Sequence, residues 1–129
     1  MAHPNAELLR AGYDAFEKGD VDALRGLMSE DIVYHWPGTG PLAGDYKGMD
    51  AVLEFFGRVG ELAQGTLTQE IHAIIADDEH AVALITASAQ RDGKTLHEKS
   101  VDVFHIRDGK VAEAWGFLED TAVDAVFWS

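Results

Sequence analysis

The feature that most constrains the fold is a pair of adjoining segments near the C-terminus, 95–106 and 110–118. Both place β-branched and aromatic residues at alternating positions, and this period of two is typical of β-strands. The Asp108-Gly109 pair between them can adopt the positive φ angles that a tight turn requires. The sequence therefore predicts a long antiparallel hairpin over 95–118.

One acid interrupts the apolar pattern of this hairpin. Asp102 lies between Val101 and Val103, where a carboxylate is costly to bury unless it is paired or used in chemistry. If Asp102 faces an apolar cavity, desolvation raises its pKa, and the neutral acid donates a hydrogen bond or transfers a proton near neutral pH. The alternative is a carboxylate on the surface or at a dimer interface, paired with Lys99 or Arg107.

The face that Asp102 occupies depends on the turn. A two-residue loop at Asp108-Gly109 pairs Asp102 with Trp115, whereas a three-residue loop with Gly109 in a bulge pairs it with Ala114. One step of register exchanges the two faces of a strand, so the two turns predict opposite environments for the acid.

The remaining segments predict helices before a sheet. Apolar residues at helical spacing favour helices over 5–18, about 20–28 and 49–62, with Asn5 and Asp20 as N-caps and Gly19 as a stop. Four glycines make 38–48 a predicted loop. Strands are predicted at 31–36, 66–76 and 80–90, and one more helical turn at 120–127.

This order of elements predicts the fold class. Helices grouped before a four-stranded meander are typical of an α+β fold, in which the helices cover one face of a curved antiparallel sheet. The chain of 129 residues is expected to form a single domain, 1–129. The hairpin also carries apolar residues on its second face, and a second subunit is the simplest cover because isologous dimers are the commonest oligomers.

Composition excludes several classes of function. The formal net charge of −13, from 23 acids against 10 Lys and Arg, disfavours nucleic-acid binding. The absence of cysteine excludes disulfides, thiolate metal sites and cysteine nucleophiles. No apolar run reaches the roughly 18 residues of a membrane span. With no leader segment in view, we expect a cytoplasmic protein.

Short motifs follow one another along nearly the whole chain, and their order and spacing are more specific than any one of them. Together they resemble the nuclear-transport-factor-2-like superfamily, and within it the SnoaL-like and ketosteroid-isomerase-related group. The resemblance implies a cone-shaped, cystatin-like barrel, a curved sheet wrapped on three N-terminal helices, with an internal cavity. The motifs are YDAFEKGD at 13–20, DAL at 22–24, DIVYHWPG at 31–38, PLAG at 41–44, YKG at 46–48, AV at 51–52, FF at 55–56 and DGKV at 108–111.

The resemblance also implies roles for single positions. In ketosteroid isomerases an Asp base acts with a Tyr phenol and a protonated Asp, and Asp102 resembles that protonated Asp. The position of the base is occupied by Trp36, with His35 beside it. The position of the phenol falls at about Gly12, with Tyr13 one residue away.

Related cyclases and epoxide hydrolases carry a further acid in the last strand, where this chain has Gly116. Because the resemblance places that position in the cavity together with Asp102, we expect the bulged turn. Trp115 and Phe117 then face outward, and with Val101 and Val103 they are predicted to form the interface of a homodimer.

The predicted catalytic residues are Asp102, as acid or oxyanion donor, and His35, as a base at the cavity rim, because a neutral imidazole accepts protons near pH 7. For His35 the alternative is a structural histidine bonded to the backbone. The residues predicted to contact a ligand are aromatic or polar, with plain core packing as the alternative for the aromatic ones: Tyr13, Phe16, Tyr34, Trp36, Phe55, Phe56, Ser100 and Phe104.

The predicted function is binding of a small apolar or polycyclic molecule, with cofactor-free acid/base chemistry such as isomerisation or aldol-type cyclisation. The alternatives are a non-catalytic binding module and a dimeric assembly domain of the same fold. No metal is expected, because His72, His80, His97 and His105 lack the spacing of a metal site. No cofactor is expected either, since the glycines match no phosphate-binding loop.

Overall fold

The computed structural model describes residues 2–129 and confirms an α+β fold, with four helices and a six-stranded sheet in this range. Within it, no helix has both the length and the apolar character needed to cross a membrane. The elements are α1 (Pro4–Lys18), α2 (Val21–Leu27), β1 (Met28–Trp36), β2 (Gly44–Lys47), α3 (Met49–Leu62), β3 (Thr68–Ala76), β4 (His80–Arg91), β5 (Lys94–Arg107), β6 (Lys110–Leu118) and α4 (Thr121–Trp128).

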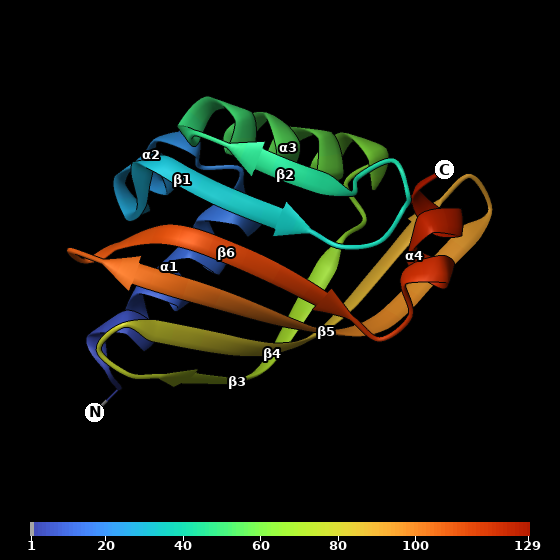
Figure 1. Ribbon diagram of the computed structural model, residues 1–129. Helices are drawn as coiled ribbons and strands as arrows, with labels where there is room; N and C mark the ends of the chain where they lie inside the picture. The colour runs from blue at the N-terminus through green and yellow to red at the C-terminus, as the bar shows by residue number, and fades with distance from the viewer. Residues whose placement is uncertain (1) are drawn as a thin grey trace.

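The sheet has the strand order β2-β1-β6-β5-β4-β3. Strands β3 to β6 form the predicted antiparallel meander, but β1 pairs with β6 in parallel, so the sheet is mixed rather than wholly antiparallel. Helices α1, α2 and α3 lie over one face of the curved sheet (Figure 1). Helix α4 packs against β5 near Lys94, the first residue of that strand. The apolar core lies between these helices and the inner face of the sheet.

The predicted loop at 38–48 contains a strand. Residues 44–47 form β2, which pairs with the end of β1 and places Tyr46 opposite Tyr34. Gly44 and Gly48 both have positive φ, so the glycines that suggested a loop turn the chain at each end of a short edge strand. The expectation of a plain loop was therefore wrong.

The predicted helix ends are confirmed at the junction of α1 and α2 but not at the start of α1. Gly19 ends α1 with φ 67°, and the Asp20 side chain accepts a hydrogen bond from Ala23 N at the start of α2. The N-cap of α1 is His3 rather than Asn5, because Pro4 occupies the first helical position.

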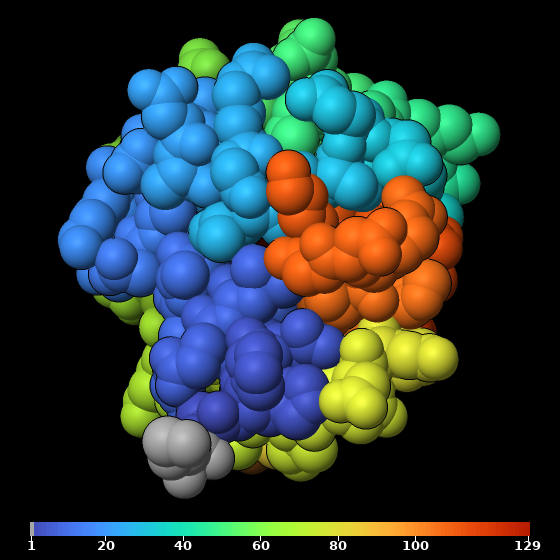
Figure 2. All heavy atoms as spheres, turned by 90° about the vertical axis from the view of Figure 1, so that its left-hand side faces the viewer, coloured from blue at the N-terminus to red at the C-terminus, as the bar shows by residue number. Residues whose placement is uncertain are grey.

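Asn5 instead joins α1 to the turn between β3 and β4, because its Nδ2 donates to the carbonyl oxygen of Asp77 at 2.9 Å. His3 Nε2 lies 3.0 Å from Asp78 Oδ1 in the same turn. Figure 2 shows the start of α1, in dark blue, beside this turn in yellow and the β5–β6 turn in orange. These contacts fix the start of α1 at the end of the sheet that carries the β3–β4 turn.

The β5–β6 hairpin differs from both predicted registers. Its turn has two residues, with Arg107 opposite Lys110, and the bulge lies within β6, where the pairing skips Ala112. Asp102 therefore pairs with Gly116 rather than with Ala114. Positions 114 and 116 share one face of a strand, so the expected facing of Asp102 holds although the expected turn was wrong.

Gly40, in the connection between β1 and β2, provides a test of how α4 packs. A Cβ on Gly40 would come within 2.7 Å of the Cα of Ala125 in α4. We expect Gly40→Ala to lower the free energy of unfolding by about 1–3 kcal/mol, as overpacking does in well-packed regions. Urea unfolding followed by circular dichroism measures this change.

The matched control is Gly57→Ala in α3, where an added Cβ meets nothing within 4 Å. Because alanine favours a helix over glycine, this variant is expected to gain up to about 1 kcal/mol. Equal stability of the Gly40→Ala variant and the wild type would contradict the close contact with α4.

Candidate functional site

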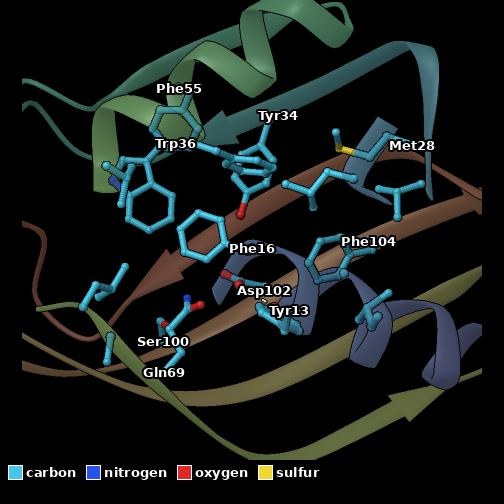
Figure 3. Close-up of a pocket in the computed structure, with 18 of the residues that line it drawn as sticks. Tyr13, Phe16, Met28, Tyr34, Trp36, Phe55, Gln69, Ser100, Asp102 and Phe104 are labelled. Atoms are coloured by element: carbon cyan, nitrogen blue, oxygen red, sulfur yellow. Dashed lines mark hydrogen bonds between the residues drawn. The ribbon is translucent and has the colours of Figure 1, made fainter. Parts of the chain in front are cut away.

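A cavity of about 120 Å³ lies between the inner face of the sheet and helices α1 and α3. Asp102 and all eight residues predicted to contact a ligand are among the residues that line it. Figure 3 shows Tyr13 and Asp102 next to each other, with Phe16, Tyr34 and Phe104 around them. The structure therefore gathers into one place residues that are spread over most of the sequence.

Alternation along the strands explains this gathering. On β5 the positions from Glu98 to Phe104 that line the cavity are every second residue, as expected when one face of a strand is buried. On β1 the same rule turns Tyr34 and Trp36 inward. The aromatic residues of α1 and α3 close the other side, where Phe16 and Phe56 meet edge to face at 5.4 Å.

The central contact of the site joins Tyr13 on α1 to Asp102 on β5. The Tyr13 hydroxyl donates a hydrogen bond to Asp102 Oδ2 at 2.7 Å. Asp102 is only 5% exposed, and burial raises its pKa to about 6, partly opposed by the hydrogen bond from Tyr13. Its carboxyl group is thus poised to exchange protons near neutral pH.

Both phenols near Asp102 remain protonated. The pKa of Tyr13 lies well above its usual value because of burial and the neighbouring charge of Asp102. The same two causes raise the pKa of Tyr34. The family resemblance placed the phenol position at about Gly12, one residue before Tyr13. In the structure the phenol that donates a hydrogen bond to Asp102 is that of Tyr13.

Three buried polar atoms of the cavity lining have no hydrogen-bond partner among residues 2–129, and two of them are Asp102 Oδ1 and Trp36 Nε1. One is an acceptor when the carboxyl is ionised, and the other is always a donor. Buried polar atoms are rarely left unpaired, because each costs about 1–3 kcal/mol. A bound molecule that offers one protic group and one acceptor would satisfy both.

Trp36 also explains why the site accommodates glycine at position 116. A Cβ on Gly116 would lie 3.0 Å from two ring carbons of Trp36. The indole therefore fills the space that a side chain on this part of β6 would need. The two positions at which the family resemblance led us to expect acids, 36 and 116, are thus next to each other.

The structure does not bring His35 to the cavity. Its ring stacks on Trp115 at 5.6 Å on the outer face, and its two nitrogens lie 2.6 Å from carboxylate oxygens of Asp45 and Glu113. These hydrogen bonds raise the pKa of His35. The predicted place at the cavity rim was wrong, because alternation that turns Tyr34 and Trp36 inward must turn His35 outward.

Glu98 is a cavity residue that the sequence interpretation missed. It is 6% exposed, lines the cavity, and its Oε2 has no partner in the described part of the chain. Burial and the neighbouring Asp124 raise the pKa of Glu98 to about 8. The sequence alone could have predicted that Glu98 faces the cavity, because Glu98 lies an even number of positions before Asp102 on the same strand.

A second hollow of about 230 Å³ lies between α1 and β3. It shares Tyr13, Phe16, Leu67 and Gln69 with the cavity, so these side chains separate the two. Its outer part is lined by charged residues of α1, namely Arg10, Asp14 and Glu17. In the range 2–129, no three His, Asp or Glu side chains form a group suited to a metal ion.

Comparisons with known proteins agree with this architecture. A family model described as a SnoaL-like domain matches residues 9–114. An uncharacterised protein of Mycobacterium tuberculosis is 27% identical over 124 residues, which are 95% of this chain and 95% of the relative. Bal32a, from a soil-derived mobile gene cassette, is 32% identical with a TM-score of 0.94, over 98% of this chain and 97% of that one.

More distant proteins share the fold alone. A protein from Jannaschia sp. CCS1 that is assigned as a SnoaL-like polyketide cyclase has a TM-score of 0.83 at 17% identity. The match covers 98% of this chain and 92% of that one.

The environment of Asp102 predicts a specific dependence of stability on pH. Because its pKa is raised from 3.8 to about 6 in the folded state, the folded protein binds this proton more tightly. The corresponding stability is complete below about pH 4 and is lost as pH rises through about 6. Between about pH 4 and pH 7 the wild type should lose about 2 kcal/mol relative to Asp102→Asn.

Urea unfolding of both proteins at the two pH values measures this double difference, in which other titrating groups cancel. Parallel pH profiles of the two proteins would show that Asp102 is an ordinary carboxylate.

Proposed function

This chain belongs to the SnoaL-like domain family, and on that premise we propose that it binds a small, largely apolar molecule in its cavity and moves a proton on it without a cofactor. The observation that carries the proposal is Asp102, a carboxyl group buried in an apolar cavity: Tyr13 donates to one of its oxygens, and the other has no hydrogen-bond partner among residues 2–129. Family membership confirms the predicted resemblance and supports ligand binding or cyclase-type chemistry in general.

The proposed reaction begins at Asp102 Oδ1. With a pKa of about 6, the carboxyl is mostly ionised at pH 7 and accepts a proton from a carbon next to a carbonyl group of the ligand. The electron pair of that C–H bond moves toward the carbonyl oxygen, and the protonated Asp102 then returns the proton to another carbon or to the oxygen. Return of the proton to another carbon gives isomerisation. In an aldol-type cyclisation the enolate carbon instead attacks a second carbonyl carbon of the ligand, the π bond of that carbonyl breaks, and its oxygen takes the proton from Asp102.

Neighbouring residues have supporting roles in this proposal. Tyr13 holds Oδ2 and thereby directs Oδ1, and Trp36 Nε1 is a buried donor available to the carbonyl oxygen. The aromatic side chains exclude water, which strengthens these polar contacts. The volume of about 120 Å³ is close to that of an engineered cavity known to hold benzene, so a ligand with one ring fits without rearrangement.

A non-catalytic binding module is the second candidate. The observation that favours it is the contact between Trp36 and Gly116, which fills the position of a second acid. His35 is bound to Asp45 and Glu113 on the outer face and is not available as a base. A binding module requires the same cavity but no proton transfer, so an assay of proton exchange separates the two functions.

We also propose that the outer face of the sheet forms a homodimer. Trp115 and Val103 lie opposite each other on this face, which the helices leave uncovered, and Phe117 is 55% exposed. Val101, opposite Phe117, extends the same apolar surface. A twofold contact would place this surface against its copy.

Proton exchange tests the proposed chemistry before a natural substrate is known. A panel of one-ring ketones is incubated with the protein in D₂O, and NMR follows the loss of the signal of protons next to the carbonyl. We expect the wild type to accelerate exchange and Asp102→Asn to slow it by about 10²–10⁴-fold, the usual contribution of a general base. His35→Gln, on the outer face, is the matched control and should exchange like the wild type.

The pH profile of exchange gives a further check. Tyr13→Phe removes a hydrogen bond that lowers the pKa of Asp102, so the acid limb of the profile should move to higher pH. Ketone binding without any acceleration of exchange, in the wild type as in Asp102→Asn, would leave the binding module as the function.

Substitution on the outer face tests the dimer. Phe117→Glu places a charge, and its copy, in the proposed interface, and we expect the molar mass from light scattering to fall from that of a dimer to that of a monomer. Val21→Glu is the control, because Val21 is similarly exposed, at 49%, but lies on α2. A monomeric wild type would overturn the proposed dimer.

A further inference from the structure

The cavity contains a second buried acid that the proposed proton transfer does not use. Glu98 and Asp102 lie four positions apart on the inner face of β5 and both line the cavity. Four residues of strand separate their Cα atoms by about 13 Å. The two carboxyl groups therefore mark different ends of the cavity and do not act on one reacting atom.

Glu98 has an acidic neighbour on α4. The carboxyl group of Asp124 lies close enough to raise the pKa of Glu98, and Asp124 Oδ1 accepts a hydrogen bond from Trp128 Nε1 at 3.0 Å. The other charged groups acting on Glu98 are Glu119 and Asp120, which are also acidic. Acidic neighbours and burial both favour a protonated Glu98 at neutral pH.

The free oxygen of Glu98 determines what this end of the cavity offers to a ligand. Glu98 Oε2 is buried and has no hydrogen-bond partner in residues 2–129. An ionised carboxyl only accepts hydrogen bonds, whereas a protonated carboxyl can donate or accept. A hydroxyl group, which both donates and accepts, satisfies this oxygen in either state.

These features define the ligand more closely than the proposed function does. We propose that Glu98 Oε2 binds a hydroxyl group of the ligand, so that the cavity takes a one-ring aromatic ketone with its carbonyl side at Asp102 and a hydroxyl group at the opposite end of the ring. A ring with a polar group at each end matches both the separation of the two acids and the volume of about 120 Å³. This inference rests on the proposed function and adds the class of ligand.

Two ketones of nearly equal size test the inference. 4-Hydroxyacetophenone carries the hydroxyl group, and 4-methylacetophenone replaces it with a methyl group. Calorimetric titration of the wild-type protein is expected to give about tenfold tighter binding of the hydroxy compound, since the methyl compound leaves a buried acceptor unpaired.

Two variants assign this preference to Glu98. In Glu98→Gln the amide nitrogen can donate to Asp124 while the amide oxygen faces the cavity, so the tenfold preference should remain. In Glu98→Met, which has a similar length but no acceptor, the preference should disappear or reverse. An unchanged preference in Glu98→Met would show that Glu98 does not contact the hydroxyl group.

The orientation of the ligand gives an independent measurement on the wild type, which is decisive if Glu98→Met does not fold. Nuclear Overhauser effects should connect the ring protons beside the hydroxyl group to Trp128, and the acetyl methyl group to Tyr13 or Phe104. The reversed orientation would overturn the inference.

Failure of the inference and failure of the proposed function give different results. If neither ketone binds, the assignment of a one-ring hydroxy ketone is wrong, whereas exchange of another ketone that depends on Asp102 would still support the chemistry. If both ketones bind equally and exchange depends on Asp102, only the role of Glu98 is overturned. Binding with the predicted preference but without exchange would support the ligand class and remove the proton transfer.

Discussion

The pairing of β5 with β6 decides which side chains of these two strands share the cavity. Because the pairing skips Ala112, Asp102 lies opposite Gly116 and faces the helices instead of the outer surface. A change of one residue in this register would turn one strand over relative to the other. Asp102 would then lie opposite Trp115 on one face, so either the two acids of β5 would leave the cavity or Trp115 and Phe117 would enter the core.

The inner face of β5 is unusual because it carries two acids among apolar neighbours. Each carboxyl has a polar neighbour on a helix: Tyr13 of α1 for Asp102, and Asp124 of α4 for Glu98. Each also retains one buried oxygen without a hydrogen-bond partner in the described part of the chain. Such groups reduce stability, and their presence at both ends of one cavity is the main physical argument that the cavity is built to bind a polar-ended molecule.

The two helices that hold these acids are themselves fixed by contacts remote in sequence. Asn5 at the start of α1 donates to the turn after β3, and Lys94 at the start of β5 donates to the carbonyl oxygens of Val126 and Ser129 at the end of α4. The position of each acid therefore depends on the folding of the whole domain. A short local segment would not reproduce the site.

The class of fold, the order of the main elements and the importance of Asp102 could be predicted from the amino-acid sequence, because periods of two and of nearly four residues and the residues at helix ends are local properties. Strict alternation along the strands also implied the outward position of His35 and the inward position of Glu98. Four features could be seen only in the folded protein: the bulge at Ala112, the edge strand β2, the contact of Trp36 with Gly116, and the hydrogen bond between Tyr13 and Asp102, 89 residues apart. These features depend on how distant segments pack together, and no local preference of the chain specifies that packing.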